Sequence, residues 1–364
     1  MALLIIPGCA IYNCAARHTL TKEIKETPRD QATGVALGAE AITIFPQANP
    51  EDGAPVIRRL IDTTHKAGET AKKGIDLFNA TAEVVRVTEE ATLPRDPETG
   101  IIIGCETLDI TPEPGSFTGD RPTTAVLLLH GFLGSRKDLA DLGERLAARG
   151  FFVRIPRLPG HGTTPEDYAA QTPETMIQGV LDEYDALHAD FDAVYVGGFS
   201  MGGALATLLA SREDVDRLVL IAPYYGVTYM WYYGLSAESW NAMMGRFIPY
   251  VIKSDAFIKV NRAEAKKELF SYHAVPTTGV ETLIRLGDEA RLPTTLAAIK
   301  CPVLLVMSDG DEAASPERAH EAYDLIGSKD KTELWLDKRN NHHILWDYDR
   351  EEAKTAIEEF LSIP

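Results

Sequence analysis

A glycine-flanked serine, placed where a strand-like segment meets a helix-like one, is the feature that most constrains this chain. An apolar β-type run leads into Gly198-Phe199-Ser200-Met201-Gly202, and a helical segment follows at once. A serine on so sharp a turn needs neighbours without side chains, because the strained backbone approaches adjacent strands and the helix. Ser200 is therefore predicted to project into a cleft, beside the positive end of the following helix.

Around this turn, from residue 124 onward, strand-like and helix-like segments alternate. Apolar runs predict strands, which fall at 124–129, 151–155, 193–199, 217–222, 302–307 and 332–336. Amphipathic segments predict helices, which fall at 135–149, 173–188, 204–211, 316–326 and 349–361. This order predicts an α/β fold, with a mostly parallel central sheet and helices on both faces. Its core is assigned to residues 116–223 and 300–364.

Length, charge and cysteine usage exclude several classes of protein. The 364 residues suffice for one large core plus an insertion or accessory segment. The formal net charge of −18 argues against nucleic acid or an anionic membrane surface as a partner, because both would repel the chain. The four scattered cysteines do not fit a disulfide framework or a zinc site. No stretch approaches the ~20 apolar residues that span a bilayer.

The first 115 residues do not fit the alternation and are predicted to form an accessory segment. A helix is predicted over 54–79, between two similar β-type segments at 33–46 and 99–112 that we expect to pair or stack along the sheet edge. The run Ile6-Pro7-Gly8-Cys9 is similar to the end of a lipoprotein signal, although a basic region is missing. It favours an envelope or exported protein; a cytoplasmic protein with a buried N-terminal strand is the alternative.

Chemistry in an open α/β sheet gathers at the carboxyl ends of the strands, and three further loops begin there. A nucleophilic serine requires a base, an acid that orients the base, and donors for the oxyanion. The glycine turn in His130-Gly131-Phe132 allows a backbone N–H to point above Ser200. Phe132 and Met201 are therefore predicted to supply the oxyanion hole, and His130 is expected to brace the loop.

Two loops offer an acid and a base, with two candidates for each. Asp309 abuts its strand, whereas Asp311 lies past the Gly310 turn and can reach the neighbouring loop. His342 and His343 are adjacent, and adjacent side chains diverge, so the two are not expected to share one role or to chelate one metal ion. The residues alone leave both choices open.

Several motifs together resemble the α/β-hydrolase superfamily, over residues from about 120 to 364. They are His130-Gly131, Leu158-Pro159-Gly160-His161-Gly162, the turn at 198–203, Asp311-Glu312, and His342 with Asp347. The combination is similar to bacterial carboxylesterases and monoacylglycerol-lipase-like enzymes. This resemblance implies Asp311 as the acid and His342 as the base, five positions before Asp347, with His343 as the alternative. It also implies that His161 fixes its own loop.

The resemblance implies a serine hydrolase that cleaves carboxylic esters through an acyl-enzyme on Ser200, without a cofactor or a metal ion. The expected substrate is a small-molecule ester or a lipid with a small to medium acyl chain, monoacylglycerol included. An acyltransferase with the same triad and a non-catalytic relative that binds an apolar ligand are the alternatives, and a peptidase stays open. Epoxide hydrolases and dehalogenases carry an aspartate at the position of Ser200, which argues against both.

The interval 224–299 interrupts the alternation and is predicted to be a cap inserted between two strands. It opens with ten residues that include five tyrosines and one tryptophan. Part of this aromatic set is expected to form the cap's own core. The rest, with Tyr224, Trp231 and Tyr232 as candidates, is predicted to line an acyl pocket.

Overall fold

The computed structural model describes residues 64–228, 237–253 and 258–363, which divide into two compact units. Of these, the smaller unit contains residues 64–88 and 237–252, and the larger contains 89–228, 253 and 258–363. Cys9, the β-type segment at 33–46, and the aromatic residues Trp231 and Tyr232 lie outside the described residues. The predictions made for them stay predictions.

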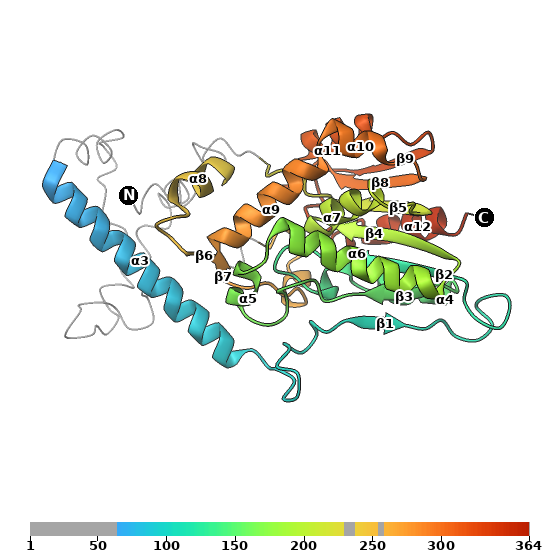
Figure 1. The fold of residues 1–364 in the computed structure, drawn as a ribbon, viewed down its shortest axis with the longest axis horizontal. Helices are drawn as coiled ribbons and strands as arrows, with labels where there is room; N and C mark the ends of the chain where they lie inside the picture. Colours follow the sequence, from blue (N-terminus) through green and yellow to red (C-terminus); the bar gives the residue numbers. More distant parts are fainter. Residues whose placement is uncertain (1–63, 229–236, 254–257, 364) are drawn as a thin grey trace. The chain divides into compact units, whose positions relative to one another are not determined.

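The larger unit is built on a sheet whose described strands lie in the order β1-β3-β2-β4-β5-β8-β9 (Figure 1). These strands are β1 (Leu108–Ile110), β2 (Thr124–Leu129), β3 (Phe152–Ile155), β4 (Ala193–Phe199), β5 (Arg217–Ile221), β8 (Val303–Ser308) and β9 (Lys331–Leu336). Neighbouring strands are parallel, except that β1 runs antiparallel to β3. The apolar β8 is buried along its whole length, as expected of a strand covered on both faces. The predicted α/β fold with a mostly parallel sheet is confirmed.

Helices of the larger unit cover the sheet in two groups (Figure 1). In one group α4 (Leu142–Ala148) contacts α12 (Arg350–Leu361). In the other, α6 (Pro173–Asp190), α7 (Met201–Ala210) and α9 (Thr277–Ala290) contact one another. The shorter elements of this unit are α5 (Pro165–Ala169), α10 (Pro293–Ala298), α11 (Pro316–Leu325), β7 (Ala274–Pro276), and the 3-10 turns η2 (Arg136–Leu139), η5 (Ala265–Lys267) and η6 (Ile344–Trp346).

The single helix predicted over 135–149 is wrong, because the segment forms η2 and α4 with a break between them. Ser135 caps η2, since its side chain accepts the Lys137 N–H. The break follows at Ala140, whose φ of 52° lies outside the right-handed helical region. Asp138, two residues earlier, points back to accept the Gly131 N–H instead of facing solvent.

The smaller unit contains residues 64–88 of α3 (Thr64–Thr92), together with α8 (Ala237–Met244) and β6 (Tyr250–Ile252). The predicted helix over 54–79 is observed from residue 64 and continues to 92; its first ten residues lie outside the described residues. Phe78 packs with Met244 and Ile248 in the core of this unit.

The predicted cap interval, 224–299, contains helices that belong to the layer around the sheet. α9 packs against α7, and α10 contacts both α7 and α11. A glycine also lets α9 approach Tyr224, because a Cβ on Gly287 would meet the Tyr224 ring. Residues 277–298 therefore contribute to the core, whereas the part of the interval that covers the site stays a prediction.

The edge strand β1 generates a prediction about residues 1–115. Asp109 pairs with Arg154 of β3 through two N–O contacts of 2.6 and 2.7 Å, and Ile102 nearby is almost fully buried. Deleting residues 1–115 should therefore lower the melting temperature by roughly 5 °C or more and promote aggregation, because it removes buried apolar area and exposes the edge of β3. Differential scanning calorimetry and light scattering measure both effects.

The control is deletion of residues 1–63 only, which leaves every described element intact. An equal loss of stability in the two truncations would contradict a structural role for β1.

Candidate active site

Ser200 sits on the turn between β4 and α7 in a conformation that non-glycine residues rarely adopt. Its φ is 55° and its ψ is −117°, and it is 7% exposed. The turn is held from both sides, since the Ser200 N–H donates to the Ile221 carbonyl and the Ser200 carbonyl accepts the Tyr224 N–H. A Cβ on Gly198 would overlap with the Gly202 backbone, and one on Gly202 with the Leu129 carbonyl. These close approaches give the physical reason for both glycines.

Three loops at the carboxyl ends of β4, β8 and β9 bring Ser200, Asp311 and His342 together. His342 Nε2 lies 2.8 Å from Ser200 Oγ, and His342 Nδ1 lies 2.7 Å from Asp311 Oδ2. Because a carboxylate only accepts, Nδ1 carries a proton and Nε2 is free to accept the serine proton. The other carboxylate oxygen of Asp311 accepts the N–H groups of Ala313 and Ala314. This geometry is that of a nucleophile, a base and an orienting acid.

The two alternative residues lie elsewhere. Asp309 is exposed at the end of β8. The His343 side chain turns away from Ser200; its Nδ1 lies 3.2 Å from the Lys259 carbonyl and its Nε2 lies 3.8 Å from Asp138 Oδ1. The divergence of adjacent side chains that the sequence predicts is thus observed for the two histidines.

The two expected oxyanion donors, the N–H groups of Phe132 and Met201, lie in the turns that follow β2 and β4. Met201 is the first residue of α7, where the N–H groups have no partner within the helix. Phe132 lies in the turn closed by the Gly134 N–H and the Gly131 carbonyl. Neither the Phe132 nor the Met201 N–H donates a hydrogen bond to any residue that the structure describes. Both donors are thus available to an oxyanion.

Two buried histidines brace the loops beside this turn. His161 Nε2 accepts the Leu133 N–H at 3.1 Å, and His130 Nε2 accepts the Leu158 N–H at 3.3 Å. Burial lowers the pKa of His130 to about 4 and that of His161 well below its ordinary value. Both rings are therefore neutral acceptors that fix the loop conformation, the roles expected for them from the sequence.

Asp347 and Asn341 also position the site, although from the sequence Asp347 is expected only to mark His342 as the base. The Asp347 carboxylate, fully buried, accepts the N–H groups of Asn341 at 2.8 Å and Asn261 at 2.9 Å. Asn341 Oδ1 accepts the N–H groups of both His342 and Glu312, so it joins the base loop to the acid loop. The signal that could have identified Asn341 is the pair of amide side chains, Asn340-Asn341, in the loop after the strand that ends at Leu336.

Tyr224 is the one proposed substrate-contacting residue that the structure describes. Its ring is 5% exposed and lies against Gly287 of α9. Its contact with a substrate stays a prediction, as do those of Trp231 and Tyr232.

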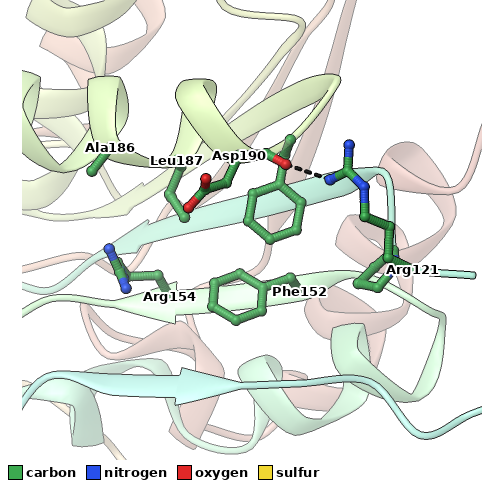
Figure 2. Close-up of a pocket in the computed structure, with 8 residues that line it drawn as sticks. Arg121, Phe152, Arg154, Ala186, Leu187 and Asp190 are labelled. Atoms are coloured by element: carbon green, nitrogen blue, oxygen red, sulfur yellow. Dashed lines mark hydrogen bonds between the residues drawn. The ribbon is translucent and has the colours of Figure 1, made fainter.

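A cavity of about 440 Å³ lies at the other end of the sheet, near the first residues of β2, β3 and β4 (Figure 2). The rings of Phe152 and Phe191 stack there with centroids 4.9 Å apart, and Arg121 donates to the Asp190 carbonyl. Because the active-site loops follow the opposite ends of these strands, this cavity is not part of the candidate site.

Among the described residues no three His, Cys, Asp or Glu side chains are grouped so that they could hold a metal ion. In the same part of the chain, no helix has the length and apolar character needed to cross a membrane.

Residues 120–349 match the family described as serine aminopeptidase, S33. The chain belongs to this family of α/β-hydrolases. Together with the sheet order and the Ser200 turn, the match confirms the resemblance inferred from the sequence motifs.

Two bacterial relatives extend over most of their own length. The chain is 26% identical to a carboxylesterase of Bacillus subtilis over 254 residues, covering 69% of this chain and 97% of the relative. It is 30% identical to a thermostable monoacylglycerol lipase of a Bacillus species over 236 residues, covering 64% and 88%.

Two solved structures of lipolytic enzymes have a similar fold. A structure of the metagenome-derived lipolytic enzymes LipS and LipT is 26% identical, with a TM-score of 0.61 over 72% of this chain and 98% of the other. A monoacylglycerol lipase of Paleococcus ferrophilus has a TM-score of 0.57 over 70% and 97%; at 21% identity it supports the fold alone.

The site geometry predicts an asymmetry between the paired candidates. His342→Ala and Asp311→Asn should each reduce kcat for an ester by about 10³-fold or more, because they remove the base or its orienting acid. Asp309→Asn should change kcat less than about threefold, because the Asp309 side chain is exposed. The loss of kcat in His343→Ala should lie between these two values. Steady-state kinetics on variants of matched melting temperature measure this order. A folded His343→Ala variant less active than His342→Ala would reverse the assignment of the base.

Proposed function

We propose that the chain hydrolyses carboxylic esters through an acyl-enzyme on Ser200. His342, oriented by Asp311, takes the Ser200 proton as Oγ attacks the ester carbonyl. The N–H groups of Phe132 and Met201 stabilise the oxyanion, and His342 then protonates the departing alcohol. Water, deprotonated by His342, releases the acid and regenerates Ser200.

The single observation that carries the proposal is the unbroken hydrogen-bonded series from Asp311 through His342 to Ser200, with distances of 2.7 and 2.8 Å. At the level of enzyme class the chain is a carboxylic ester hydrolase, since its family membership and relatives agree with this site. The proposed refinement is the role of each residue and the identity of the ester.

For the substrate, we propose esters of small to medium acyl chains, monoacylglycerols included. One relative is a monoacylglycerol lipase and another a carboxylesterase, and the aromatic residues near 224–233 supply apolar area for an acyl chain. An acyltransferase would use the same triad with an alcohol in place of water. A non-catalytic relative that binds an apolar ligand does not fit so complete a site. The family's description as aminopeptidases keeps peptide cleavage as the second candidate function.

A panel of nitrophenyl esters with acyl chains of increasing length tests the proposal, run with wild type and Ser200→Ala. Wild type should turn over the esters and be labelled by a fluorophosphonate, whereas Ser200→Ala should lose the labelling and about 10⁴-fold or more in kcat. Full ester turnover by Ser200→Ala would refute the mechanism. An aminoacyl nitroanilide tests the peptidase activity, and added alcohol acceptors test for acyl transfer.

The aromatic residues of the predicted cap give a further prediction. Trp231→Ala or Tyr232→Ala should raise KM for a medium-chain ester and leave that for an acetate ester nearly unchanged, because each buried methylene contributes ~0.8 kcal/mol. Equal changes in KM for the two esters would assign these residues to the packing of the cap instead.

A further inference from the structure

A buried carboxyl group, that of Asp138, lies behind the loop that carries the Phe132 N–H. Its Oδ2 accepts the Gly131 N–H at 2.9 Å, and the residue is 3% exposed. The loop closes tightly over this group, because a Cβ on Gly134 would overlap with the carboxylate. Asp138 therefore sets the path of the turn from Gly131 to Gly134.

The second oxygen of Asp138 faces a histidine. His343 Nε2 lies 3.8 Å from Asp138 Oδ1, and His343 Nδ1 lies 3.2 Å from the Lys259 carbonyl. Since a carbonyl only accepts, Nδ1 of His343 carries a proton, and neutral His343 presents a lone pair towards Asp138. Two lone pairs that face each other in a buried site repel, so a proton between Oδ1 and Nε2 stabilises the pair.

The environment places this proton on the acid. Burial raises the pKa of Asp138 to about 7 and lowers the pKa of His343 well below its ordinary value. The charged and titratable groups that act on Asp138 or respond to it are Lys253, His342, His343 and Cys105. The cation of Lys253 and that of a protonated His342 both favour the ionised acid, yet burial outweighs them.

We propose that Asp138 and His343 form a second acid–histidine pair that holds one proton on Asp138 Oδ1 and positions the oxyanion loop in its active conformation. Asp138 is a positioning residue that acts through Gly131. This inference rests on the proposed function, since the loop matters for turnover only if Phe132 receives an oxyanion.

Loss of the proton from Asp138 slows the reaction through its effect on the charge of the oxyanion loop. A negative charge then lies against the same short turn that must accept the oxyanion, and like charges repel. Wild-type activity should therefore have an alkaline limb that is set by Asp138.

The pH dependence of kcat in wild type, Asp138→Asn and His343→Gln tests this pairing. In wild type, kcat should fall by about threefold or more along the alkaline limb. Because asparagine mimics the protonated acid, Asp138→Asn should lack this fall. Glutamine presents an N–H to Oδ1 and stabilises the carboxylate, so His343→Gln should move the limb to lower pH. Asp138→Ala, which loses the acceptor for Gly131, should lower kcat while KM stays nearly constant.

The matched control is Asp141→Asn, the same substitution three positions along the chain on an exposed acid that pairs with Lys354. It should leave the shape of the pH profile unchanged. Parallel profiles for wild type and Asp138→Asn would overturn the proposal. Should Asp138→Asn not fold, the shift of the limb in His343→Gln decides the question on an intact acid.

Thermal stability provides a readout that does not depend on turnover. The pKa of Asp138 is raised on folding, so the folded chain keeps a proton that the unfolded chain loses above its ordinary value of about 3.9. The contribution of this acid to the free energy of unfolding therefore falls as the pH rises from about 3.9 to about 7. Above about pH 7 this contribution no longer changes with pH. The melting temperature of Asp138→Asn relative to wild type should rise over the same window.

A melting-temperature difference between Asp138→Asn and wild type that does not vary with pH would contradict the bound proton. Because this measurement needs no substrate, it separates the two ideas: full turnover by Ser200→Ala would refute the ester mechanism, and only the Asp138 data bear on the pair.

Discussion

The close approach of backbone to backbone at Ser200 is the constraint on which the rest of the site depends. Ser200 adopts a positive φ that costs on the order of 1–3 kcal/mol, and the packing of β4, β5 and α7 around it maintains that conformation. Gly198 and Gly202 permit the approach, since a side chain at either position would overlap with main-chain atoms. The same turn aims Oγ at His342 and leaves the Met201 N–H unpaired within the helix.

Buried polar groups then hold the neighbouring loops to this fixed point. Asn341 joins the acid loop to the base loop, and Asp347 ties the base loop to the segment at 261–262. Asp138 does the same for the oxyanion loop through Gly131. Each group is buried and accepts backbone N–H groups, which holds the loops in place although none of them is a regular element. Phe199 packs beneath both histidines and completes the contact between the loops.

Much of the fold follows from local sequence pattern. The apolar runs at 124–129 and 193–199 form strands with those bounds, because a continuous apolar segment is stable only when it is covered on both faces. The pattern failed at 135–149, where a helical periodicity spans a break at Ala140. Beside that break the Asp138 carboxyl accepts the N–H of Gly131, seven residues earlier, and a propensity argument does not contain such a contact.

The sequence by itself determined the strand–turn–helix around Ser200, the order of nucleophile, acid and base along the chain, and the α/β class, because spacing and glycine positions carry this information locally. Only the tertiary structure distinguished His342 from His343 and Asp311 from Asp309 by contact. The two candidates in each pair are of the same residue type and differ only in where their side chains point. That direction is set by the loops against which they pack. The pairing of Asp138 with His343 joins positions 205 residues apart and arises for the same reason.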